Sequence, residues 1–137
     1  MTATARAVSL AEAAVEAAAD KKASDLLLLD VSDQLVITDC FVLASAPNER
    51  QVKAVVDAIE ERLLGMAAKP IRREGERDHR WVLLDYGDIV VHVQHAEERV
   101  YYSLERLWKD CPELPLPAGA RPSAAEPAGV GGSAAGS

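Results

Sequence analysis

Asp85 and Asp88 are the residues of this chain whose type and spacing come closest to a catalytic pair. Two carboxylates that share one face can hold Mg²⁺ for phosphoryl or nucleotidyl transfer. Such an enzyme also needs a loop that cradles phosphate, and no glycine-rich loop or Walker pattern precedes a helix in this sequence. Aspartates that flank a tight turn commonly cap it by accepting hydrogen bonds from backbone N–H groups. Turn capping is therefore the favoured interpretation, and a Mg²⁺-dependent transferase is the alternative.

The other residue types that could do chemistry give weaker signals. His92 and His95 are three apart, so in a strand they point to opposite faces, and no cysteine with metal-ligand spacing lies nearby. We expect His92 to pack against Trp81 and His95 to be solvated. Cys40 falls in a predicted buried strand, and Ser45 lacks a G-x-S-x-G context, so packing and capping are their expected roles. The sequence thus predicts no catalytic residue, no metal and no cofactor.

The two aspartates lie in residues 81–92, which predict a β-hairpin whose two-residue turn ends in glycine. In the expected register Asp85 pairs with Asp88 and Trp81 with His92. Because side chains alternate across a strand, the residues divide between two faces. One face is aliphatic (Val82, Leu84, Ile89 and Val91) and the other is mixed (Trp81, Leu83, Asp85, Asp88, Val90 and His92). The aliphatic face suits a core, and the mixed face suits a surface that meets a partner.

The elements that position the hairpin follow from hydrophobic periodicity and turn residues. Helices are expected over residues 6–22, 48–64 and 97–110, and further strands over residues 25–31, 40–45 and 69–74. The last helix is expected to carry an apolar stripe made of Val100, Tyr101, Leu104, Leu107 and Trp108. The connection over residues 32–39 reads as polar. This order predicts an α/β fold, an α+β sandwich with a mixed sheet of about five strands flanked by helices.

Composition limits the class of protein. The chain has 137 residues, which favours one domain. Its net charge of −7 argues against a nucleic-acid binder that works through phosphate contacts, and no direct sequence-specific nucleic-acid binding is expected. An acidic body is instead attracted to basic protein surfaces. No apolar run approaches the roughly 18 residues of a membrane span, and no secretory signal is recognisable, so a cytoplasmic protein is expected. We expect the domain over residues 1–112 and a disordered Pro/Ala/Gly-rich tail over residues 113–137.

A set of short motifs occurs in order along the chain, and together they point to a family. The motifs are Asp30-Val31-Ser32, Thr38-Asp39-Cys40-Phe41, Arg50-Gln51-Val52, Glu74-Gly75, Trp81 to His92 and Glu98 to Trp108. Over about residues 8–110 the chain resembles the ribosomal silencing factors, also called RsfS or Iojap-like proteins. It departs from the usual family pattern at Cys40, where tyrosine is common, and at His79-Arg80, where glycine is frequent.

The resemblance implies a fold related to nucleotidyltransferases but without their catalytic signature, and a role that is not enzymatic. It implies binding to the large ribosomal subunit through ribosomal protein fourteen, which keeps the small subunit from docking and represses translation during starvation. It also implies a homodimer when the protein is free. The expected contacts are Trp81, Leu83, Tyr86, Asp88, His92 and Tyr102, with Asp85, Glu98 and Arg99 orienting or steering the partner.

Overall fold

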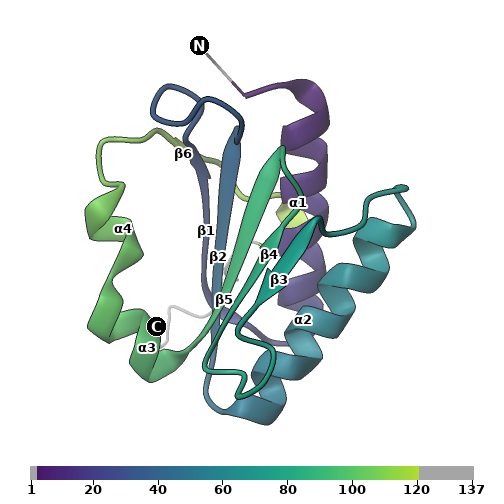
Figure 1. Ribbon diagram of the computed structural model, residues 1–137, viewed down its shortest axis with the longest axis vertical. Helices are drawn as coiled ribbons and strands as arrows, with labels where there is room; N and C mark the ends of the chain where they lie inside the picture. The colour runs from purple at the N-terminus through teal and green to yellow at the C-terminus, as the bar shows by residue number, and fades with distance from the viewer. Residues whose placement is uncertain (1–2, 121–137) are drawn as a thin grey trace.

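A computed structural model describes residues 3–120 of the chain, except the side chains of Tyr101, Tyr102 and Glu105. In chain order the elements are α1 (Ala5–Asp20), β1 (Ser24–Asp30), β2 (Cys40–Ala46), α2 (Glu49–Leu64), β3 (Arg72–Glu74), β4 (Trp81–Asp85), β5 (Ile89–His95), α3 (Ala96–Tyr102), α4 (Leu104–Leu107), β6 (Glu113–Leu114) and the 3₁₀ turn η1 (Ala118–Ala120). The expected α/β architecture is confirmed, with helices on both faces of one sheet (Figure 1).

The sheet has six strands in the order β3-β4-β5-β2-β1-β6. Strands β2 and β5 are parallel at its centre, and the remaining pairs are antiparallel. The sixth strand, β6, lies within residues 113–137, where we expected a disordered tail. This strand pairs with β1, and Leu114 lies opposite Leu28. The structured part of the chain therefore runs past the expected boundary at residue 112. Residues 121–137 lie outside the described part of the chain.

Helices α1 and α2 cover one face of the sheet, and α3 and α4 lie on the other (Figure 1). The first face holds the larger core, where alternate strand residues such as Val42, Val82 and Val91 meet the helices. Helix α1 contributes mostly alanines, whose small side chains let the helix backbone lie close to the sheet. Asn48 caps the N-terminus of helix α2, as expected, because its Oδ1 accepts a hydrogen bond from Gln51 N at 2.8 Å.

The second face is covered only in part, because the expected helix over residues 97–110 is broken. Ser103 has a left-handed backbone (φ +45°), which ends α3, and α4 begins at the next residue. The expected apolar stripe is therefore wrong at two positions, since Val100 is 79% exposed and Leu107 is 73% exposed. Leu104 and Trp108 still pack on the sheet, as expected.

Candidate functional site

The β4–β5 hairpin forms with its turn one residue later than expected. Tyr86 N donates to Ile89 O at 2.9 Å, so Gly87 and Asp88 make the turn, and the expected pairing of Asp85 with Asp88 is wrong. The physical reason is that Gly87, at φ +86°, occupies the first turn position, where a positive φ favours glycine. Each β4 residue meets a partner two places further along β5 than expected. A shift of two preserves the side of the sheet, so the aliphatic and mixed faces of the strands are confirmed.

Tyr86 belongs to the aliphatic face in this register and is buried in the core beside α1 and α2. Burial raises the pKa of its hydroxyl to about 12. Within the described part of the chain, the hydroxyl has no hydrogen-bond partner. The expectation that Tyr86 contacts a partner directly is therefore corrected, because its ring lies on the wrong side of the sheet.

The mixed face is hollowed beside β4. A groove of about 330 Å³ lies between the loop over residues 35–38 and β4, and its lining includes Val36, Ile37, Leu83 and Asp85. A second hollow of about 300 Å³ adjoins it at Leu83 and reaches Trp81. We call Val36, Ile37, Trp81, Leu83 and Asp85 the open face. Val36 is 98% exposed and Ile37 is 80% exposed, so this apolar loop is left uncovered by the fold.

Trp81 is half-buried, and His92 supports it from the sheet. The indole Nε1 donates to His92 Nδ1 at 3.2 Å, and the Phe41 ring packs edge-on against the imidazole with centroids 5.1 Å apart. His92 is only 6% exposed. Burial, with a smaller effect of the Arg99 charge, lowers the pKa of His92 to about 4. The imidazole is thus neutral near pH 7 and packs against Trp81 as expected, but its burial leaves almost no surface for direct contact.

Asp85 is engaged within the fold. Its Oδ1 accepts a hydrogen bond from Gly87 N at 2.8 Å, and its Oδ2 lies 3.5 Å from Arg72 Nη2. The turn-capping interpretation is confirmed for Asp85, while Asp88 is exposed at the turn itself. In the described ranges, no group of three or more His, Cys, Asp or Glu side chains is placed to hold a metal ion.

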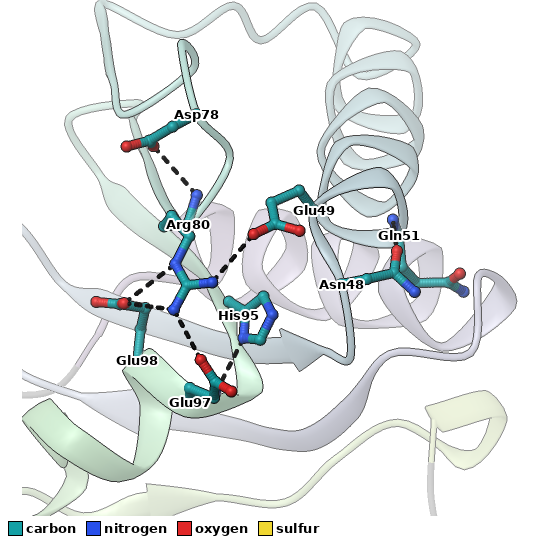
Figure 2. Close-up of polar contacts among 8 residues, drawn as sticks. All are labelled: Asn48, Glu49, Gln51, Asp78, Arg80, His95, Glu97 and Glu98. Carbon is teal, nitrogen blue, oxygen red and sulfur yellow. Dashed lines mark hydrogen bonds and ion pairs between the residues drawn. The ribbon is translucent and has the colours of Figure 1, made fainter.

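The candidate residues on α3 are distributed differently from the expectation. Glu98 accepts two hydrogen bonds from the Arg80 guanidinium, from Nε at 3.2 Å and Nη2 at 3.0 Å (Figure 2). Arg99 is buried, so it does not offer a steering charge on the surface. The side chain of Tyr102 lies outside the described residues. His95, expected to be solvated, is buried and caps α3 by accepting from Glu97 N at 3.1 Å.

Reasoning from the sequence missed Val36 and Ile37, because residues 32–39 were interpreted as a polar connection. Two adjacent aliphatic residues in an otherwise polar loop were the available signal. Nothing in the local sequence says whether such a pair is buried or exposed. Val36 and Ile37 belong to the site because the structure leaves them exposed and places them in the same groove as Leu83.

Comparisons with known proteins agree on one family. A family model described as "Ribosomal silencing factor during starvation" matches residues 3–133. The chain is 39% identical over 107 residues to ribosomal silencing factor RsfS of Halalkalibacterium halodurans, covering 78% of this chain and 92% of that protein. It is 38% identical over 104 residues to the RsfS of Bacillus subtilis, covering 76% and 88%. Protein Iojap of Zea mays, a chloroplast protein, is 32% identical over 114 residues, covering 81% and 46%.

Two solved structures share the fold. A crystal structure of a Bacillus halodurans protein is 37% identical with a TM-score of 0.70, and the match covers 80% of this chain and 99% of that one. A crystal structure of a Chromobacterium violaceum protein is 32% identical with a TM-score of 0.72, and the match covers 88% and 96%. Between residues 3 and 120, no helix is both long enough and apolar enough to cross a membrane.

Proposed function

We propose a partner and a mode of action for this chain, which belongs to the ribosomal silencing factor family. The chain binds the large ribosomal subunit through ribosomal protein fourteen and acts in the cytoplasm. It occupies volume that the small subunit must enter, so the two subunits do not join and translation is repressed. The mode of action is steric exclusion, which requires a docked body and no catalysis.

One observation supports this proposal above the others, namely the open face. Apolar side chains left uncovered beside one another on a soluble chain commonly mark an interaction surface. Val36, Ile37 and Leu83 supply aliphatic area, and Trp81 supplies the residue type most enriched among interface hot spots. A standard interface buries about 800 Å² on each partner, which needs the open face and its surroundings together.

The acidic charge of this chain indicates that the proposed partner is basic. The chain carries a net charge of −7, and Asp85 and the exposed Asp88 lie at the turn end of β4. Acidic groups at the margin of an interface favour a basic partner and speed its encounter. We propose that Asp85 and Asp88 steer a basic ribosomal protein, and that Glu98 and Tyr102 of α3 add contacts at the other end.

His92 and Arg99 have a supporting role in this proposal. Both side chains are buried, His92 on β5 and Arg99 on α3, so they hold Trp81 and α3 in position instead of contacting the partner. The competing Mg²⁺-dependent transferase draws no support from the geometry around Asp85. Both oxygens of that carboxylate have partners inside the fold.

We propose further that the free chain forms a homodimer through the same open face. An apolar surface that the fold leaves uncovered can also be buried against a second molecule of the same chain. Dimer formation would then compete with ribosome binding by mass action. Light scattering of the free chain, repeated with increasing amounts of large subunit, would show dimers converting to bound monomers.

Gradient sedimentation tests the proposed function. Purified large and small subunits are mixed with and without the chain, and the fraction of joined ribosomes is measured. We expect the joined peak to fall as the chain is added, and the chain to sediment with large subunits. The Trp81→Ala variant should lose both effects. Leu64→Ala is the matched control, because Leu64 is exposed on α2, which covers the other face of the sheet. Equal binding by wild type and Trp81→Ala would contradict the assigned surface.

A further inference from the structure

Arg80 precedes β4 and connects three parts of the fold. Its carbonyl oxygen accepts a hydrogen bond from His95 N at 2.8 Å, and its own N–H donates to Asp78 Oδ1 at 3.2 Å. The backbone of Arg80 is therefore held both by the end of β5 and by the charged loop before β4. Trp81 of the open face is the next residue along the chain.

The Arg80 guanidinium donates hydrogen bonds to carboxylates at the start of two helices (Figure 2). Nη1 reaches Glu49 Oε2 at 3.0 Å, in the first turn of α2. Nη2 reaches Glu97 Oε1 and Glu98 Oε2, both at 3.0 Å, in the first turn of α3. The planar fork of arginine can satisfy several carboxylates at once, whereas the compact lysine ammonium cannot span them in the same way.

Helix α3 depends on such contacts for its place. It has seven residues, well below the roughly 12–15 at which an isolated helix becomes even marginally stable in water. The left-handed Ser103 interrupts it at its far end, so α4 does not extend it as one rod. Its near end is held by the His95 cap and by Arg80.

Helix α3 packs against β5, the strand that carries His92, and the Arg99 side chain of α3 is buried. The Arg99 charge is also a lesser cause, after burial, of the lowered pKa of His92. His92 in turn accepts the hydrogen bond from the Trp81 indole. A displacement of α3 would therefore change the surroundings of His92 and, through it, the position of Trp81.

We infer that Arg80 is a positioning residue for the open face, which clamps α3 through Glu97 and Glu98 and so keeps the Trp81 indole in its binding position. This inference rests on the proposed function for its effect on ribosome binding. The clamp itself is a property of the free chain and can be measured without ribosomes.

The test compares Arg80→Met with Arg62→Met. Arg62 is the matched control because it also pairs with two carboxylates, Glu16 and Asp20, but joins α2 to α1 away from the open face. We expect Arg80→Met to raise amide hydrogen exchange in α3 at least tenfold and to weaken large-subunit binding at least fivefold. In a Trp108→Phe background, acrylamide should quench the remaining Trp81 fluorescence more strongly. Arg62→Met should change none of these.

Conservative variants separate positioning from a general loss of stability. Arg80→Lys should restore binding only in part, since it keeps the charge but not the fork. The double variant Glu97→Gln with Glu98→Gln keeps Arg80 and its Glu49 contact but removes the charge pairing with α3. It should raise α3 exchange and Trp81 quenching in the same direction as Arg80→Met, and it is compared by these two readouts only, because Glu98 is itself a proposed partner contact. Glu49→Gln should have a smaller effect on binding because it leaves α3 clamped. If Arg80→Met does not fold, the Glu97/Glu98 double variant decides the question.

Two failures can be distinguished. Unchanged α3 exchange and unchanged Trp81 quenching in Arg80→Met or the double variant would overturn the positioning role. Absence of large-subunit binding by the wild-type chain would instead overturn the proposed function, while exchange and quenching would still decide the role of Arg80.

Discussion

The indole Nε1 of Trp81 donates a hydrogen bond to Nδ1 of His92, although the two residues are not opposite one another in the hairpin. Leu83 lies opposite His92, and Trp81 lies opposite Gln94, so the indole reaches diagonally across the strands. The bond uses the polar edge of Trp81 inside the protein. The rest of the half-buried ring remains beside the hollow at Leu83, where a partner can cover it.

Substitutions at Trp81 should separate ring area from the hydrogen bond. Trp81→Ala removes both and should weaken large-subunit binding by about tenfold to a hundredfold, the range typical of an interface hot spot. Trp81→Phe keeps an aromatic ring and should retain part of the affinity. It leaves His92 Nδ1 without its donor, which should lower the free energy of unfolding by about 1–2 kcal/mol. Co-sedimentation and urea unfolding measure the two effects, and equal affinity of wild type and Trp81→Ala would contradict the prediction.

His92 should make stability depend on pH. Burial lowers its pKa in the folded chain to about 4, whereas an unfolded imidazole titrates near 6.5. As pH falls from about 6.5 to about 4, the unfolded state binds the proton first, so the free energy of unfolding should fall by up to roughly 3 kcal/mol. Urea unfolding of wild type and His92→Gln at several pH values measures this difference. The two stability curves should converge as pH falls, and parallel curves would show that His92 is not responsible.

The exposed loop at Val36 and Ile37 should affect binding but not folding. Replacing both residues with serine changes only solvent-facing groups, so the free energy of unfolding should stay within about 0.5 kcal/mol. Large-subunit binding should weaken at least tenfold if this apolar area is sealed by the partner. Thermal unfolding and co-sedimentation measure the pair of effects. Full binding by the double variant would move the contact surface away from this loop.

Two glycines with positive φ should respond differently to alanine. A Cβ on Gly87 would meet only the flexible end of Ile71, so Gly87→Ala should cost about 1–2 kcal/mol for its backbone conformation. A Cβ on Gly75 would collide with the Trp81 carbonyl group, so Gly75→Ala should cost about 3 kcal/mol or more. Urea unfolding compares the two variants. Equal losses would mean that the close approach of Gly75 to the β4 backbone is easily relaxed.

Some residues of the motifs that identified the family make hydrogen bonds within the chain that hold the fold together. Asp30 Oδ2 accepts a hydrogen bond from Ala3 N at 3.1 Å, and its Oδ1 accepts two from Ser32. Asp39 Oδ2 accepts one from Thr4 N at 2.9 Å. Burial opposes ionisation of Asp30, but its hydrogen bonds lower its pKa overall. These two aspartates fasten the start of α1 to the ends of the loop between β1 and β2, and they need no partner for this.

The local sequence determined the elements and the faces of the hairpin. Apolar spacing at 3.6 residues identified α2, and alternation separated Val82 and Leu84 from Trp81 and Leu83. Both signals are local, because they depend on residues a few positions apart. A register error of two residues left the faces intact for the same reason, since alternation has a period of two.

Tertiary structure alone decided which of those residues remain available to a partner. The side chains of His92 and Arg99 were buried by the packing of α3, while Val36 and Ile37 were left uncovered. Arg80 acquired its role from carboxylates 17 to 31 residues away in the chain. Burial and charge pairing depend on neighbours brought together by the fold, and no pattern of nearby residues encodes them.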